Sequence, residues 1–201
     1  MKRTVLFLLA AFLLVSVISV LPIHGEGAIY DSVIRLHVLA NSDSDEDQRL
    51  KLAVRDALLA KTRVLLAGVK TRDGAEDILE DSLEALTATA SEAVACEGYD
   101  YPVRIVLGEE KYPTRRYENL AFPAGEYLSM RVLIGEGAGE NWWCVLFPPL
   151  CLSAATAKSE AEDAFLSAGL TGEQYRIITD SENAKYRLRF KILEVAKELF
   201  D

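Results

Sequence analysis

The sequence predicts an α+β fold. We expect a mixed or antiparallel sheet, two long helices in the N-terminal half and shorter C-terminal helices, preceded by an N-terminal hydrophobic segment. The order of periodicities carries this prediction, because one alternating segment precedes two helical stretches and a series of alternating segments follows them. With 201 residues, 50% of them hydrophobic, the chain is long enough for one globular domain, which we place at residues 29–201.

The chain begins with an export segment. Lys2 and Arg3 precede an uncharged apolar run over residues 4–21, which is typical of a secretory signal or a membrane anchor. At about 18 residues the run is near the lower limit for spanning a bilayer, and no A-x-A cleavage site follows it. Residues 1–25 are therefore either a signal peptide or an uncleaved anchor that keeps residues 4–21 in the membrane. In both cases the remaining chain is exported.

The first half of the domain contains one strand and two helices. Residues 33–39 alternate, with Ile34, Leu36 and Val38 on one face. Apolar residues then recur at spacings of three and four over residues 45–67 and again over residues 73–96. Gly68, directly after the first stretch, and Gly98, two residues after the second, predict their ends.

The second half changes to a strand period. We expect turns at residues 108–110 and 119–125, and a flexible glycine-rich turn at residues 135–141. Residues 184–193 fit a last strand or the start of a C-terminal helix through Phe200, and we favour the helix. The expected strands are residues 101–107, 111–117, 126–134 and 142–147, and a helix is expected within residues 156–168.

Composition excludes several functions. Lysine and arginine number 22 against 31 acidic residues, and the resulting net charge of −9 argues against a nucleic-acid-binding surface. The chain has no G-x-S-x-G, H-E-x-x-H or S-x-x-K motif. His24 adjoins the hydrophobic segment, so His37 is the single histidine of the domain, and on an alternating strand we expect it to be structural. We therefore predict no catalytic residue, no metal site and no cofactor.

An acidic turn follows the first strand. Asp43, Asp45 and Asp47 have the spacing of calcium-loop ligands, but Gln48 and Val54 replace the glycine and glutamate that such a loop requires. Short polar and acidic residues before a helix are typical of an N-terminal cap. Capping is the main interpretation, and a partner-binding role for Asp43 and Asp45 is the alternative.

The three cysteines leave two interpretations open. Cys144 and Cys151 flank the Phe147–Pro148–Pro149 segment, and a disulfide between them is possible if the prolines turn the chain back. Alternatively, all three cysteines, including Cys96, are buried free thiols.

Both tryptophans of the chain are adjacent residues in the strand expected at residues 142–147. Core packing is the usual role of such residues, but Trp142 and Trp143 must point to opposite faces. One of them is therefore a candidate partner anchor beside a rigid proline turn. The candidate partner-binding residues are Trp142, Trp143, Phe147, Pro148, Pro149, Asp43 and Asp45.

Three stretches resemble the stage II sporulation protein R family. They are IRLHVLANSDS at residues 34–44 with its continuation to residue 56, GEY and RVLIG within residues 125–135, and GENWWCVLFPPLC at residues 139–151. The last fifty residues match only in general character, and the role of residues 152–201 is not assigned.

The resemblance implies a signalling protein of endospore formation rather than an enzyme. Members are exported across the forespore membrane into the intermembrane space. They are thought to activate a membrane-embedded aspartic protease of the mother cell, which then processes pro-sigma-E. The competing classes are an exported cell-wall hydrolase that uses carboxylates and a structural envelope protein.

Overall fold

The computed structural model describes residues 29–117, 120–149 and 158–179, together with residue 11. The hydrophobic N-terminal segment, Cys151 and the expected C-terminal helix therefore lie outside the described residues. Within the described residues, no helix is both long and apolar enough to cross a bilayer. The elements are β1 (Ile34–Leu39), α3 (Asp45–Leu65), α4 (Arg72–Asp81), α5 (Leu83–Cys96), β2 (Val103–Tyr112), β3 (Arg115–Tyr117), β4 (Leu120–Phe122), β5 (Gly125–Ile134), β6 (Asn141–Phe147), α6 (Lys158–Ser167) and α7 (Gly172–Thr179).

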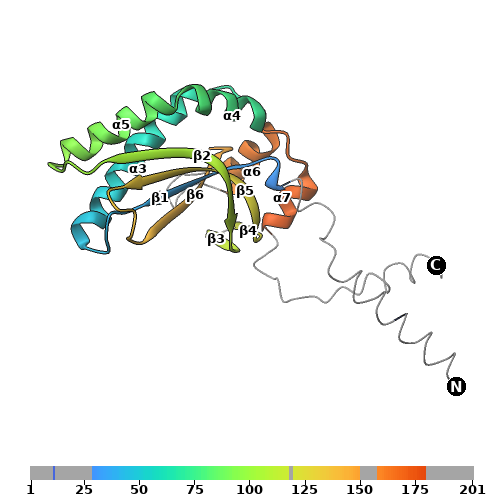
Figure 1. Cartoon of the computed structure of the whole chain (residues 1–201). Helices are drawn as coiled ribbons and strands as arrows, with labels where there is room; N and C mark the ends of the chain where they lie inside the picture. Colours follow the sequence, from blue (N-terminus) through green and yellow to red (C-terminus); the bar gives the residue numbers. More distant parts are fainter. Residues whose placement is uncertain (1–10, 12–28, 118–119, 150–157, 180–201) are drawn as a thin grey trace, which may run out of the picture.

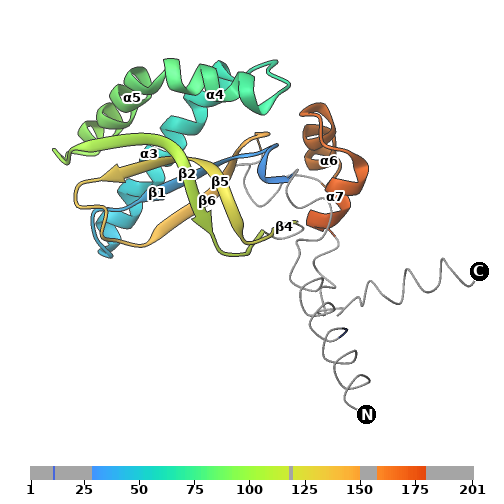
Figure 2. The same cartoon turned by 45° about the vertical axis from the view of Figure 1, so that its right-hand side comes forward.

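The main sheet is mixed, which confirms the predicted α+β class. Its strand order is β2-β5-β1-β6, and β1 runs parallel to β5 but antiparallel to β6. Helices α3, α4 and α5 cover one face of the sheet (Figure 1). The small β3–β4 hairpin, α6 and α7 pack against the other face near one end of the sheet (Figure 2). The domain therefore has two hydrophobic cores, one on each side of the sheet.

Helix α3 begins where its sequence supplies a cap. The Ser44 side chain accepts a hydrogen bond from the Asp47 backbone N–H, and acidic residues fill the first turn. Leu50, Val54 and Leu58 are buried against the sheet, as their spacing predicts. The helix ends shortly before Gly68, whose φ of +80° suits a residue without Cβ.

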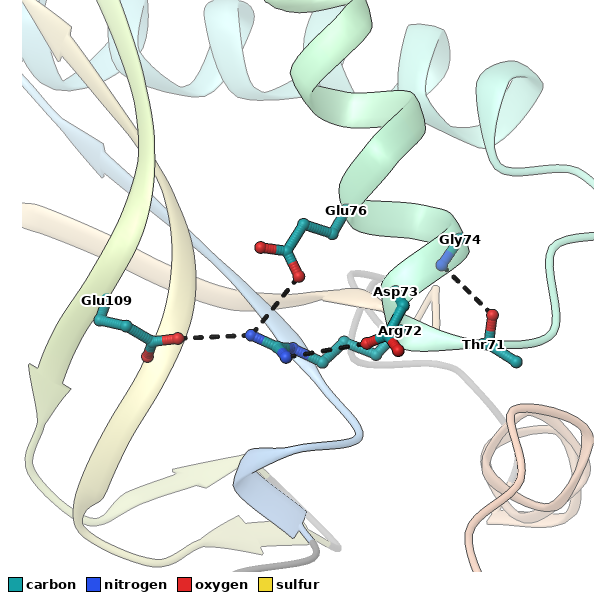
Figure 3. A network of polar contacts seen from close by, with 6 residues as sticks. All are labelled: Thr71, Arg72, Asp73, Gly74, Glu76 and Glu109. Carbon is teal, nitrogen blue, oxygen red and sulfur yellow. Dashed lines mark hydrogen bonds and ion pairs between the residues drawn. The ribbon is translucent and has the colours of Figure 1, made fainter.

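The second predicted helix is two helices rather than one. Ser82 separates α4 from α5, and its N–H bonds back to carbonyls of the last turn of α4. Arg72 links the start of α4 to the sheet, because its Nη2 lies 3.3 Å from Glu109 Oε1 of β2 (Figure 3). The same nitrogen lies 3.7 Å from Glu76 Oε2 within α4. Both helices bury their apolar sides in the same core, through Ala75 and Leu79 of α4 and through Leu86, Ala90 and Val94 of α5.

Two predicted turns were wrong. Residues 108–110 continue β2, which pairs with β5 over its whole length and sets Gly108 opposite Ser129. Pairing with a central strand satisfies the backbone at Gly108, and this tertiary contribution outweighs the local preference of glycine for a turn. Residues 119–125 contain β4, which pairs with β3. The short helix α7 was not predicted from the sequence.

Candidate partner-binding site

Arg35 is a fully buried charge beneath the site. Its exposed fraction is 0%, although alternation along β1 indicated only that it lies on the strand face opposite Ile34, Leu36 and Val38. Its Nε donates to the Cys144 carbonyl at 3.1 Å, and its Nη2 donates to the Tyr117 hydroxyl at 2.8 Å. The guanidinium carbon lies 4.5–5.8 Å from the centres of the aromatic rings of Tyr112, Phe122, Tyr127 and Tyr117.

This aromatic cage replaces the carboxylate that a buried arginine usually pairs with. The aromatic faces stabilise the cation, and the two hydrogen bonds satisfy part of its donor set. Burial raises the pKa values of Tyr112 and Tyr117, so both remain neutral hydroxyls. Sequence reasoning missed the cage, because its rings come from β2, β3, β4 and β5.

His37 is a satisfied structural histidine, as predicted. Its Nδ1 lies 2.9 Å from Glu110 Oε1, and its Nε2 lies 2.8 Å from Asn141 Oδ1. The ring is 6% exposed, and its centre lies 5.2 Å from that of Trp143. With both nitrogens engaged, His37 holds Trp143 and the start of β6 in position.

Trp142 and Trp143 lie on opposite faces of β6, an edge strand of the sheet. Trp142 is opposite Val38 and is 38% exposed, and the Arg55 guanidinium carbon lies 4.3 Å from its ring centre. Trp143 is half-buried between His37 and Arg115, whose guanidinium carbon lies 3.3 Å from its ring centre. Trp142 is thus the ring that a partner could contact, whereas Trp143 packs mainly against residues of its own domain.

The two prolines of the turn after β6 differ in exposure. Phe147 and Pro148 are buried and support the turn, so neither offers a surface of its own, whereas Pro149 is exposed. The turn borders a mainly apolar groove of about 440 Å³ between the C-terminal end of α3 and α6. Of the candidate aromatic and proline residues, Trp142, Pro149 and part of Trp143 are therefore accessible.

The acidic turn is primarily a cap and a clamp. Asp43 Oδ1 accepts from the Glu140 backbone N–H at 2.7 Å, and Asp47 Oδ2 accepts from Asn41 Nδ2 at 2.8 Å. Asp45 is exposed in the first turn of α3. The capping interpretation is confirmed, and the partner-binding role of Asp43 and Asp45 stays a prediction.

The glycine-rich loop at residues 135–140 is held rather than flexible, which corrects our expectation. The Gly139 N–H donates to the Ala40 carbonyl at 2.9 Å, and the Glu136 N–H donates to Asn41 Oδ1 at 3.0 Å. A Cβ on Gly139 would collide with the Ser42 carbonyl. Glycine therefore serves close approach between this loop and the acidic turn.

The Asp47 carboxylate makes stability depend on pH. Burial alone would raise the pKa of Asp47, but hydrogen bonds from Ser42 and Asn41 outweigh burial and hold the pKa below its usual value. A lowered folded-state pKa gives stability that is present at neutral pH and is lost as pH falls through it. We expect Asp47→Asn to lower the urea midpoint at pH 7, and the gap to wild type to shrink by pH 3. Asp45→Asn is the exposed control, and a gap that is equal at both pH values would contradict the prediction.

The cysteines differ in their surroundings. Cys96 is an exposed free thiol, so the interpretation of three buried thiols is wrong. Cys144 is buried, with an exposed fraction of 7%. Cys151 lies outside the described residues, and its pairing with Cys144 stays a prediction.

The pairing has a direct chemical test. If the exported chain is alkylated before reduction and then digested, we expect the label on Cys96 and a linked peptide pair that contains Cys144 and Cys151. Reduction before alkylation is the control and should label all three. Label on Cys144 without reduction would contradict the predicted bridge.

Within the part of the chain that the structure describes, no group of three or more histidine, cysteine or acidic residues converges as a metal site. The described polar clusters instead join strands, cap a helix and anchor a loop. The fold and site define an α+β domain that buries a caged arginine under a mixed sheet and presents tryptophan at an edge strand.

The chain belongs to the stage II sporulation protein R family. The family model described as stage II sporulation protein R matches residues 30–157. The stage II sporulation protein R of Bacillus subtilis (strain 168) is 36% identical over 198 residues, which cover 92% of this chain and 88% of that protein. No solved structure matches the chain. The predicted resemblance is thus confirmed, and the family places the chain in sporulation.

Proposed function

We propose that this protein is an exported signal of endospore formation. It crosses the forespore membrane, reaches the intermembrane space and activates a membrane-embedded aspartic protease of the mother cell, which then processes pro-sigma-E. The observation that carries the proposal is the family match over residues 30–157, which includes the Trp142–Trp143 strand and its proline turn. Lys2 and Arg3, followed by the apolar segment at residues 4–21, support export.

The geometry supports a recognition mechanism. Trp142 is a large, partly exposed ring that packs against Arg55. Pro149, in the turn that follows β6, is also exposed. A rigid aromatic anchor loses little conformational entropy when it binds. The protein would shift the protease to its active state through a higher affinity for that state, since a ligand with equal affinity for both states shifts nothing.

A reconstitution in a non-sporulating bacterial host tests the proposal. The host would express this chain, the candidate protease and pro-sigma-E, and removal of the pro-sequence would be followed by immunoblot. We expect processing only when this chain is present and carries residues 1–25. The matched control deletes residues 1–25, so that the same domain stays inside the cell.

Two outcomes would contradict the proposal. Processing that is independent of this chain, with all three proteins detected, would remove the signalling function. Processing by the variant without residues 1–25 would show that export is not part of the mechanism. Release of wall fragments by this chain alone would instead favour the hydrolase alternative.

A further inference from the structure

One half of the sheet face opposite α3–α5 has no covering layer among the described residues. Strand register places Val106, Arg131, His37 and Trp143 in one row across the sheet, since each is opposite the next. The adjacent row contains Arg104, Leu133, Leu39 and Asn141. We call these two rows, apart from the buried His37, the open face.

Apart from Arg115 of β3, whose guanidinium lies over Trp143, the covering elements stop before the open face. The second core collects residues of β3, β4, α6 and α7 over Tyr112, Tyr127 and Val145, which lie toward the other end of the sheet. In Figure 2 these elements lie at that end, away from the loops that follow β1 and β5. Consistently, Arg104, Arg131 and Asn141 are exposed, and Val106, Leu133, Leu39 and Trp143 are only half-buried.

The open face is positively charged on an acidic protein. Neither row contains an acidic residue, and within the described residues no ion pair involves Arg104 or Arg131. Glu110, a carboxylate beside the rows, is engaged by His37. Because Arg104 is opposite Leu133, Arg104 and Arg131 are diagonal neighbours about 7–8 Å apart at the backbone.

We propose that the open face docks an acidic, partly apolar segment of the protease's exposed part. Two carboxylates of that segment would pair with Arg104 and Arg131, and an apolar side chain between them would cover Val106 and Leu133. Arginine suits this role because its planar group binds carboxylates through two hydrogen bonds. The inference rests on the proposed function. It adds a second contact to that of Trp142, which lies on the opposite face of the sheet.

Charge argues against two other occupants. The chain's own residues 184–193 contain four basic residues and no acidic one, so they would be repelled by the open face. A phospholipid surface with anionic headgroups would extend beyond the two arginines and meet the rest of a protein of net charge −9, whereas a single acidic segment would meet only the open face.

The test uses the full chain in the three-protein reconstitution. We expect Arg104→Glu and Arg131→Glu each to lower processing about tenfold or more, because reversal places like charges together. The matched control is Lys61→Glu, the same charge change at an exposed site of α3 on the opposite side of the sheet, and it should process normally. In parallel, a photo-crosslinking residue at Val106 should capture the protease, and one at Lys61 should not.

The outcomes separate this inference from the proposed function. If pro-sigma-E is not processed in the presence of the wild-type chain, the proposed function is overturned and the inference with it. Normal processing by a folded Arg104→Glu/Arg131→Glu variant, without capture from residue 106, would overturn only the inference. Binding of the wild-type chain to phosphatidylglycerol vesicles that depends on both arginines would also overturn it, in favour of a lipid surface. Thermal unfolding of each variant at the wild-type midpoint verifies its fold.

Discussion

Replacing Trp142 by alanine is expected to lower processing of pro-sigma-E roughly 30-fold or more while leaving the protein folded. The ring is 38% exposed at an edge strand and is backed on one face by Arg55. Truncation therefore removes the surface that a partner would contact but opens little space in the core. Large aromatic side chains with rigid support dominate the energetics of most interfaces, which is why the expected effect is large.

The measurement is pro-sequence removal at matched levels of exported protein. Val64→Ala is the control, because Val64 is an apolar residue of α3 with an exposed fraction of 75%. Its truncation should leave processing unchanged. Trp142→Phe should retain part of the activity. Normal processing by Trp142→Ala would show that this ring is not the anchor.

Trp143 requires a separate interpretation. Its ring packs on His37 and under Arg115, so Trp143→Ala removes internal contacts as well as surface. We expect this variant to lose both processing and stability. Only the Trp142 variant therefore separates recognition from folding.

Replacing Arg35 by alanine is expected to destabilise the domain by about 3–5 kcal/mol, the range seen when a large buried side chain is removed. The change leaves a cavity among four aromatic rings and removes donors from the Tyr117 hydroxyl and the Cys144 carbonyl. A loss of this size is a large part of the total stability of a typical domain. Urea unfolding of the purified protein measures it.

Two variants distinguish charge from volume at this position. Arg35→Lys keeps the charge but not the planar group, and we expect an intermediate loss because an ammonium cannot stack on several rings at once. Arg35→Met keeps most of the volume and removes the charge. If the urea midpoint of Arg35→Ala equals that of the wild-type protein, the cage does not stabilise the fold.

Local patterns were sufficient for the elements whose periodicity agrees with their burial. The strand at β1, the capped start of α3 and the strands β5 and β6 appear where alternation, capping residues and spacing predicted them. Adjacent tryptophans on a strand must also face opposite sides, so the sequence predicted two different roles for Trp142 and Trp143. The satisfied role of His37 followed from its place on a strand.

Patterns failed where a distant segment changed the outcome. Gly108 continues a strand because β5 pairs with it, and the loop at residues 135–140 is ordered because the acidic turn binds it. Neither contact is visible in the local sequence.

The sequence by itself therefore determined the fold class, the family and the residue types at the edge strand, because these depend on local periodicity and on contiguous motifs. Only the tertiary structure decided that Arg35 is caged, that Phe147 is buried and that Arg104 and Arg131 share a face that no described element covers. Burial and charge pairing depend on which strands become neighbours, and the order β2-β5-β1-β6 places β1 beside residues of β5 and β6 that lie more than ninety positions later in the chain. Side-chain environment is in this sense a property of the whole sheet, whereas strand and helix formation is largely a property of each segment.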